Sequence, residues 1–172
     1  MKERQNIILI GMSGAGKSTL GVLLAKALGM QFTDTDLLIQ QHTGKLLQQI
    51  LDTEGVDAFL QIEEEILLSC DFQNCVIATG GSAVYSQKGM EKLRQSGTVV
   101  YLAVGYEELK RRLLNITTRG IVFKGGADLH SLLEERLPLY EKYADLRVEP
   151  AEDGIEGSVE KLVLALQGFC DK

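Results

Sequence analysis

The chain has 172 residues, of which 45% are hydrophobic and 24% charged, and its formal net charge is −6. These values are ordinary for a globular protein, and the length predicts a single domain over residues 1–172. The acidic balance argues against nucleic acid or an acidic membrane as a partner, and the longest apolar run, "TVVYLAV", is too short to span a bilayer.

Predicted strands and helices alternate along the chain. Short apolar runs rich in β-branched residues predict strands at 6–10, 75–79 and 98–104, and weaker runs predict strands at 31–34 and 146–149. Helical patterns cover 17–28, 36–41, 45–52, 55–69, 86–95, 105–114, 128–143 and 158–169. In the last of these, Ser158 is the expected N-cap, and one side holds Val159, Leu162, Val163, Leu166 and Phe169. Near-continuous apolar strands are typical of parallel sheets, so the pattern predicts a three-layer α/β sandwich around about five parallel strands.

Two further features bear on cellular location. The N-terminal stretch "MKERQNIILIG" carries charges but no small-residue cleavage site, so no signal peptide is expected. The three cysteines are an odd number, and Cys70 and Cys75 lack the second pair or the histidines of a zinc site. Reduced thiols and a cytoplasmic location are therefore predicted.

The stretch "GMSGAGKST" matches the phosphate-loop pattern G-x-x-x-x-G-K-[ST] between a predicted strand and a predicted helix. Glycines permit the tight turn, and the loop amides and the helix N-terminus would face phosphate oxygens. Lys17 would bridge the β- and γ-phosphates of a nucleoside triphosphate, and Ser18 would bind Mg²⁺. The predicted nucleotide contacts are Gly11, Gly14, Ala15, Gly16, Lys17, Ser18 and Thr19.

Two acids follow the second predicted strand, in the stretch "FTDTD". Open α/β sheets bind ligands at the carboxyl ends of their strands, so Asp34 and Asp36 should reach toward the phosphates. We expect one to hold Mg²⁺ through water and the other to orient and deprotonate an acceptor hydroxyl. The alternative is a turn in which Asp36 caps the helix that follows.

Two later stretches have a functional and a structural interpretation. The paired glycines of "ATGGSAV" (78–84) would let the backbone approach a ligand closely, or form a plain tight turn. The segment 115–128, "NITTRGIVFKGGAD", predicts a mobile flap. Its Arg119 would either close over transferring phosphates or be a solvated charge.

The helix predicted over 55–69 carries an acid on its apolar face. At roughly 100° per residue, Val56, Phe59, Leu60 and Leu67 gather on one side, and Glu63 projects from the middle of it. A carboxylate is costly to bury without a partner, and Leu60, one turn earlier, offers no cation.

Together these stretches resemble the shikimate kinase family of small P-loop kinases over nearly the whole chain. The resemblance lies in the order and spacing of "GMSGAGKSTLGVLLAKALG", "FTDTDLLI", "TEGVDAFLQIEE", "IATGGSAV" and "ERLPLYEKYAD". It implies a five-stranded parallel sheet in the order 2-3-1-4-5, with substrate-binding helices over about 36–69 and a lid over about 115–128. It also implies ATP and Mg²⁺ as cofactors and a small-molecule hydroxyl acceptor.

The resemblance assigns roles to individual residues. Asp34 matches the aspartate linked to Mg²⁺ through water, and Asp36 matches the base that holds the acceptor hydroxyl. Arg119 would act with Lys17 on the ATP phosphates, and Arg112 would lie on adenine. The implied acceptor-binding residues are Asp36, Glu63, Gly80, Gly81, Ser82 and Arg136, of which Arg136 grips the substrate carboxylate and Glu63 points into the pocket.

The chain departs from the family pattern in its acceptor pocket. Leu60 stands where the family has an arginine that is a second carboxylate clamp, Gln40 stands for a common acid, and Ser82 replaces a third glycine. A hydrogen bond to a charged group contributes about 1.5–3 kcal/mol, so the missing clamp should weaken carboxylate binding by roughly 10- to 150-fold. Lys45 and Lys124 are candidate replacement cations.

The predicted function is phosphorylation of a hydroxyl by ATP, with shikimate as the leading acceptor and shikimate 3-phosphate as the product. One alternative is a kinase for a different small hydroxylated metabolite, with a repurposed pocket. Another is an ATP-binding module without catalysis, which the presence of Asp36 and Arg119 argues against. We expect a monomer with no nucleic-acid or membrane partner.

Overall fold

A five-stranded parallel sheet forms the centre of the computed structural model, which describes residues 5–114 and 128–170. The strands are β1 (Asn6–Ile10), β2 (Gln31–Asp34), β3 (Cys75–Ala78), β4 (Gly97–Leu102) and β5 (Leu146–Val148). Each pairing is parallel, and the order is β2-β3-β1-β4-β5. The predicted fold class and strand order are therefore confirmed.

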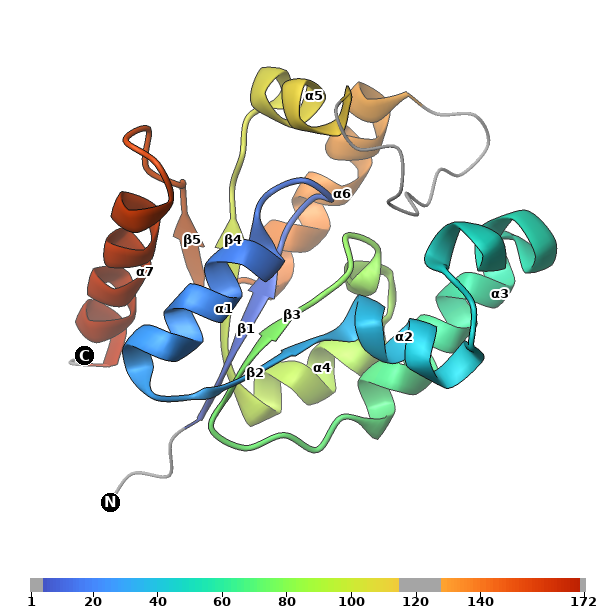
Figure 1. Cartoon of the computed structure of the whole chain (residues 1–172), viewed down its shortest axis with the longest axis horizontal. Helices are drawn as coiled ribbons and strands as arrows, with labels where there is room; N and C mark the ends of the chain where they lie inside the picture. The colour runs from blue at the N-terminus through green and yellow to red at the C-terminus, as the bar shows by residue number, and fades with distance from the viewer. Residues whose placement is uncertain (1–4, 115–127, 171–172) are drawn as a thin grey trace.

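Helices cover both faces of the sheet (Figure 1). One face carries α1 (Lys17–Leu28) and α7 (Ile155–Cys170), which contact each other, and the other carries α4 (Gln87–Ser96) and α6 (Leu129–Tyr143). Beyond the carboxyl ends of the strands lie α2 (Thr35–Thr43), α3 (Leu47–Ser69), the short 3-10 helix η1 (Ala83–Tyr85) and α5 (Tyr106–Leu114). The loops that carry the candidate site therefore meet along one edge of the sheet.

The main core lies between the sheet and its helices. All five residues of β1 are buried, with Ile8 and Leu9 at 0% exposure, as the continuous apolar runs predicted. A smaller cluster joins α2 to α3 and contains Ile39, Leu47, Ile50, Phe59, Ile66 and Cys70. This second cluster fixes the position of the helices that border the candidate acceptor pocket.

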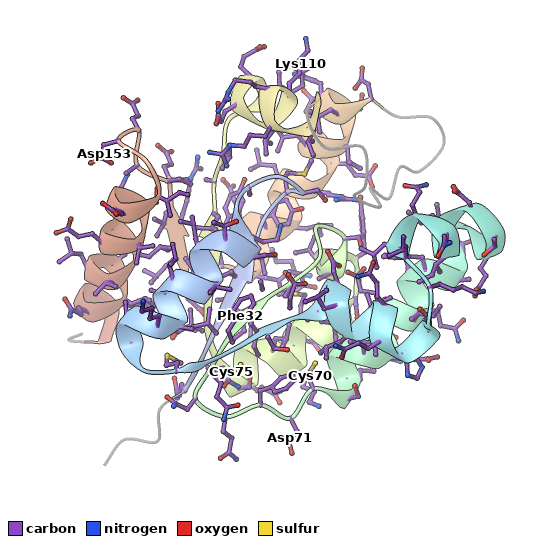
Figure 2. The ribbon with its side chains drawn as sticks, in the orientation of Figure 1. Phe32, Cys70, Asp71, Cys75, Lys110 and Asp153 are labelled. Atoms are coloured by element: carbon purple, nitrogen blue, oxygen red, sulfur yellow. The ribbon has the colours of Figure 1, made fainter. Side chains whose placement is uncertain are left out.

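The cysteines Cys70 and Cys75 are free and buried, as expected for reduced thiols. Figure 2 labels both at the amino-terminal edge of the sheet, opposite the phosphate loop. Within residues 5–114 and 128–170, no helix is long and apolar enough to cross a membrane.

The helices expected at 45–52 and 55–69 correspond to the two parts of α3, which meet in a kink at Gly55, where the backbone is non-helical with φ 84° and ψ 176°. Two details of the last predicted helix are wrong. Ser158 does not cap the last helix, because α7 begins at Ile155 and the Ser158 hydroxyl instead donates to Gly154 O at 2.7 Å. Phe169 is 40% exposed and does not share the buried side of α7.

Candidate active site

The phosphate loop joins β1 to α1 and is shaped for an anion. Gly11 has φ 144°, and a Cβ at this position would lie 2.8 Å from the carbonyl oxygen of Leu102, so the turn requires glycine. Gly16 is left-handed at the N-cap of α1, with φ 94°. Lys17 is 7% exposed, and its Nζ donates to the carbonyl oxygens of Gly11 and Met12, both at 2.8 Å. The loop therefore keeps a cation and a helix N-terminus at the predicted phosphate position.

An acid–hydroxyl pair lies beside this loop. Ser18 Oγ donates to Asp34 Oδ2 at 2.5 Å, which joins the start of α1 to the end of β2. Asp34 Oδ1 accepts from the backbone N–H of Asp36 at 2.9 Å and so caps α2. The alternative that Asp36 is the cap is wrong, because Asp36 already lies in the first turn of the helix. Hydroxyl and carboxylate oxygens are ligands that Mg²⁺ prefers, so this pair fits the predicted metal.

The predicted phosphate and acceptor residues meet at a cavity of about 250 Å³. Its lining contains Lys17, Ser18, Asp34, Asp36 and Gly81 from the predicted set. The other lining residues are Ser13, Leu37, Gln40, Leu47 and Thr79, of which the sequence pointed only to Gln40 as part of the acceptor pocket. Two of the unpredicted residues had a signal in the sequence, since Ser13 lies inside the phosphate loop and Thr79 directly precedes the glycine pair.

The glycine pair after β3 lets charged groups approach the backbone. A Cβ on Gly80 would lie 2.6 Å from Glu63 Oε1 and 2.7 Å from Asp36 Oδ1. A Cβ on Gly81 would lie 2.9 Å from both Arg136 Nη1 and Ser13 Oγ. The functional interpretation of the pair is thus favoured over a plain turn, because side chains from three helices converge on it.

Glu63 on α3 is almost completely buried at the same place, with 1% exposure. Ser82 Oγ donates to Glu63 Oε2 at 2.6 Å, whereas Oε1 has no hydrogen-bond partner among the described residues. Burial raises the pKa of Glu63 from 4.5 to about 8; the Ser82 hydrogen bond lowers this pKa, Asp36 raises it, and Arg136 and Lys17 lower it. Glu63 is therefore largely protonated at pH 7.

Arg136 on α6 reaches the glycine pair from the opposite side and is 1% exposed. Its Nε donates to the Tyr85 hydroxyl at 3.3 Å, and its guanidinium carbon lies 5.2 Å from the centre of the Tyr85 ring. The Tyr85 hydroxyl in turn donates to Glu135 Oε1 at 2.5 Å. Nothing in the sequence singled out Tyr85, because its contact with α6 depends on how η1 folds back.

Known proteins share the sequence and the fold of this chain. A model of the shikimate kinase family matches residues 13–167. The chain is 41% identical over 169 residues to the shikimate kinase of Synechococcus sp. (strain RCC307), across 95% of this chain and 85% of that protein. It is 36% identical over 170 residues to the shikimate kinase of Vibrio parahaemolyticus serotype O3:K6, across 97% and 99%.

A solved structure of shikimate kinase from Acinetobacter baumannii in complex with shikimate has 32% identity and a TM-score of 0.88. The alignment covers 95% of this chain and 93% of that one. The chain belongs to the shikimate kinase family.

A second, larger cleft of about 1160 Å³ lies on the other side of the phosphate loop. Its lining includes five of the predicted nucleotide contacts, Gly14, Ala15, Gly16, Thr19 and Arg112. Arg112 Nη1 donates to the carbonyl oxygen of Gly14 at 3.1 Å, and its Nε donates to Glu108 Oε1 at 2.6 Å. These two bonds hold the guanidinium of Arg112 beside the loop.

The positions predicted to depart from the family pattern, and the candidate replacement cation Lys45, have local structural roles. Leu60 is half-buried and packs against the smaller core cluster. Gln40 Oε1 accepts from the backbone N–H of Leu47 at 3.3 Å, at the start of α3. Lys45 donates to Glu54 Oε1 at 2.5 Å on the surface, so the structure gives it a different partner from a substrate carboxylate.

The lid predicted from the resemblance, at about 115–128, lies outside the described residues except for Asp128. Arg119, Gly120 and Lys124 belong to this part, as does the predicted flap up to residue 127. Asp128, its last predicted residue, is the N-cap of α6 and accepts from the backbone N–H of Ser131 at 2.8 Å.

Proposed function

We propose that the protein transfers the γ-phosphoryl group of ATP to a hydroxyl of shikimate, giving shikimate 3-phosphate and ADP. The observation that carries this proposal is the shared cavity, which is lined by Asp36, Lys17 and Ser18 and also by Gly81, beside Arg136. A proton acceptor, a phosphate cation and a carboxylate clamp thus surround one small space. The family relative crystallised with shikimate supports the same acceptor.

The chemistry assigned to these residues is proton transfer and charge neutralisation. Asp36 would accept the proton of the acceptor hydroxyl. The oxygen of that hydroxyl would bond to the γ-phosphorus while the bond between the γ-phosphorus and the ADP oxygen breaks. Lys17 would exchange the carbonyl oxygens of Gly11 and Met12 for phosphate oxygens. Ser18 and Asp34 would hold Mg²⁺, directly or through water, and the ion would neutralise charge between the β- and γ-phosphates.

Binding roles follow from position and charge. Arg136 would pair with the substrate carboxylate, since it is a buried cation at the acceptor end of the cavity. Arg112 would lie on adenine in the larger cleft, and Arg119 would neutralise phosphate charge by the family resemblance. We further propose a cytoplasmic monomer that has no nucleic-acid or membrane partner.

A second candidate function is phosphorylation of a different small hydroxylated metabolite. The observation that favours it is Leu60, which puts an apolar side chain at the sequence position of the family's second clamp. Lys17 and Arg136 are the cations that act on Glu63 at this site, and with Lys17 assigned to phosphate, Arg136 is left to bind a substrate carboxylate.

The test is ADP release in a coupled assay, with shikimate, gluconate and a panel of polyols and hydroxy acids. The wild type and Leu60→Arg are run side by side. Saturable turnover on shikimate by the wild type supports the first candidate. Turnover only on another panel member, or on shikimate only after Leu60→Arg, supports the second.

A further inference from the structure

Ser82 occupies a place where the backbone does not need the glycine of the family pattern. Its φ of −91° and ψ of −4° are open to any L-residue. The side chain is 4% exposed and donates its hydroxyl hydrogen to Glu63 Oε2 at 2.6 Å. The serine therefore adds a buried contact between η1 and α3 that a glycine cannot make.

The second oxygen of Glu63 lies beside Gly80, close to Asp36, which lines the cavity. Glu63 Oε1 and Asp36 Oδ1 both lie within 2.7 Å of the Cβ position of Gly80, so the two oxygens are at most about twice that distance apart. Oε1 is buried and makes no hydrogen bond within residues 5–114 and 128–170. A buried polar atom without a partner is unfavourable, and such atoms in native proteins call for a functional explanation.

Burial favours a neutral carboxyl group at Glu63. Asp36 faces it from α2, Lys17 from α1 and Arg136 from α6, and burial outweighs the two cations in keeping the pKa of Glu63 near 8. In a neutral carboxyl group, the oxygen that accepts from Ser82 is the carbonyl oxygen. The hydroxyl hydrogen is then on Oε1, where it can be donated to a ligand.

We propose that Ser82 is a positioning residue of the acceptor site, which holds Glu63 so that its Oε1 donates a hydrogen bond to an oxygen of the acceptor. That oxygen neighbours the hydroxyl that Asp36 deprotonates, so the favoured acceptor carries two adjacent hydroxyl groups. This inference rests on the proposed function of the same cavity. It assigns the pocket a neutral donor in addition to the carboxylate clamp of Arg136.

The inference is tested by the pH dependence of kcat/KM for the acceptor that the wild type phosphorylates. The wild-type value should fall above about pH 8, since an ionised Glu63 cannot donate and repels Asp36. In Ser82→Ala the KM for this acceptor should rise roughly tenfold, with the KM for ATP unchanged, because one hydrogen bond that orients a ligand group is lost. In the wild type the Ser82 hydrogen bond lowers the pKa of Glu63, so its loss in Ser82→Ala should raise this pKa. The fall in kcat/KM should therefore occur at higher pH in the variant.

Two variants and one control complete the experiment. Ser82→Thr should restore the wild-type profile because it keeps the hydroxyl, and Glu63→Gln should remove the fall at high pH. Glu64→Gln is the matched control, because the carboxylate of Glu64 accepts from Ser86 at 2.6 Å and not from Ser82. An acceptor KM and a pH profile that are the same in Ser82→Ala and wild type would overturn the inference.

A different result is expected if the proposed function itself is wrong. In that case the wild type turns over no acceptor at any pH, and the ionisation of Glu63 is followed by carbon NMR of its labelled carboxyl group instead. A titration that shifts upward in Ser82→Ala supports the pairing of the two residues without turnover. A titration that does not shift contradicts it.

Discussion

Gly80→Ala tests how closely the two carboxyl groups of the acceptor site approach the backbone. Gly80 does not have the left-handed conformation that disfavours alanine, so the expected effect is steric. The new Cβ would lie 2.6 Å from Glu63 Oε1 and 2.7 Å from Asp36 Oδ1, whereas an ordinary contact begins at 3.4 Å. Each oxygen must therefore retreat by roughly 0.7–0.8 Å, since atoms repel steeply inside contact distance.

A displacement of this size should be costly for catalysis. Misplacing a reacting group by about 1 Å costs on the order of 100-fold in rate, so kcat/KM for the acceptor should fall by about that factor. The KM for ATP should stay within about twofold, because the nucleotide cleft does not include Gly80. The added methyl group should also destabilise the fold by about 1–3 kcal/mol through overpacking.

The assay is steady-state ADP release with either substrate varied, together with urea unfolding. Gly168→Ala is the matched control, since no atom lies within 4 Å of a Cβ at that exposed position of α7. It should keep full activity and gain at most about 1 kcal/mol of stability, because alanine favours helix over glycine. Wild-type acceptor kinetics in Gly80→Ala would refute the close approach of Asp36 and Glu63.

Three further predictions address charge at the same site. Asp36→Asn should lower kcat by about 100- to 10,000-fold, as expected for a lost general base, while equilibrium titration shows unchanged ATP binding. Leu60→Arg should lower the KM for a carboxylate-bearing acceptor by roughly 10- to 150-fold through an added charged hydrogen bond, whereas Gln61→Arg, which adds the same charge on the exposed side of α3, should not. Because the folded pKa of Glu63 is raised from 4.5 to about 8, its stability contribution is fully present below pH 4.5 and is lost as pH rises through 8. Urea titrations should therefore show wild-type stability falling with a limiting slope of roughly 1.4 kcal/mol per pH unit between these values, and an equal slope in Glu63→Gln would rule out this origin.

Local patterns in the sequence predict most of the fold. The buried run of β1 and the phosphate loop depend on residues close in the chain, and α1 spans the predicted range of residues 17–28. The position of Glu63 on the apolar side of α3 also follows from helical periodicity, and its burial at 1% agrees. These features are determined by dihedral preferences and hydrophobic spacing, which a single sequence records.

Long-range contacts are what the sequence could not predict. The bond from Ser82 to Glu63 depends on how η1 meets α3, and the contact of Arg136 with Tyr85 depends on how α6 crosses the same loop. The N-cap expected at Ser158 fails for a related reason, since its hydroxyl is used by the loop before α7. In each case a tertiary partner decides which hydrogen bond a polar side chain makes.

The most direct test of the proposed function follows the phosphoryl group itself. Purified wild-type protein is incubated with Mg²⁺, shikimate and ATP labelled in the γ-phosphate, and the product is separated and identified by mass spectrometry. The proposal predicts label in shikimate 3-phosphate, in amounts equal to the ADP formed, and almost none with Asp36→Asn. ADP formation without labelled shikimate 3-phosphate, or equal labelling with the wild type and Asp36→Asn, would contradict it.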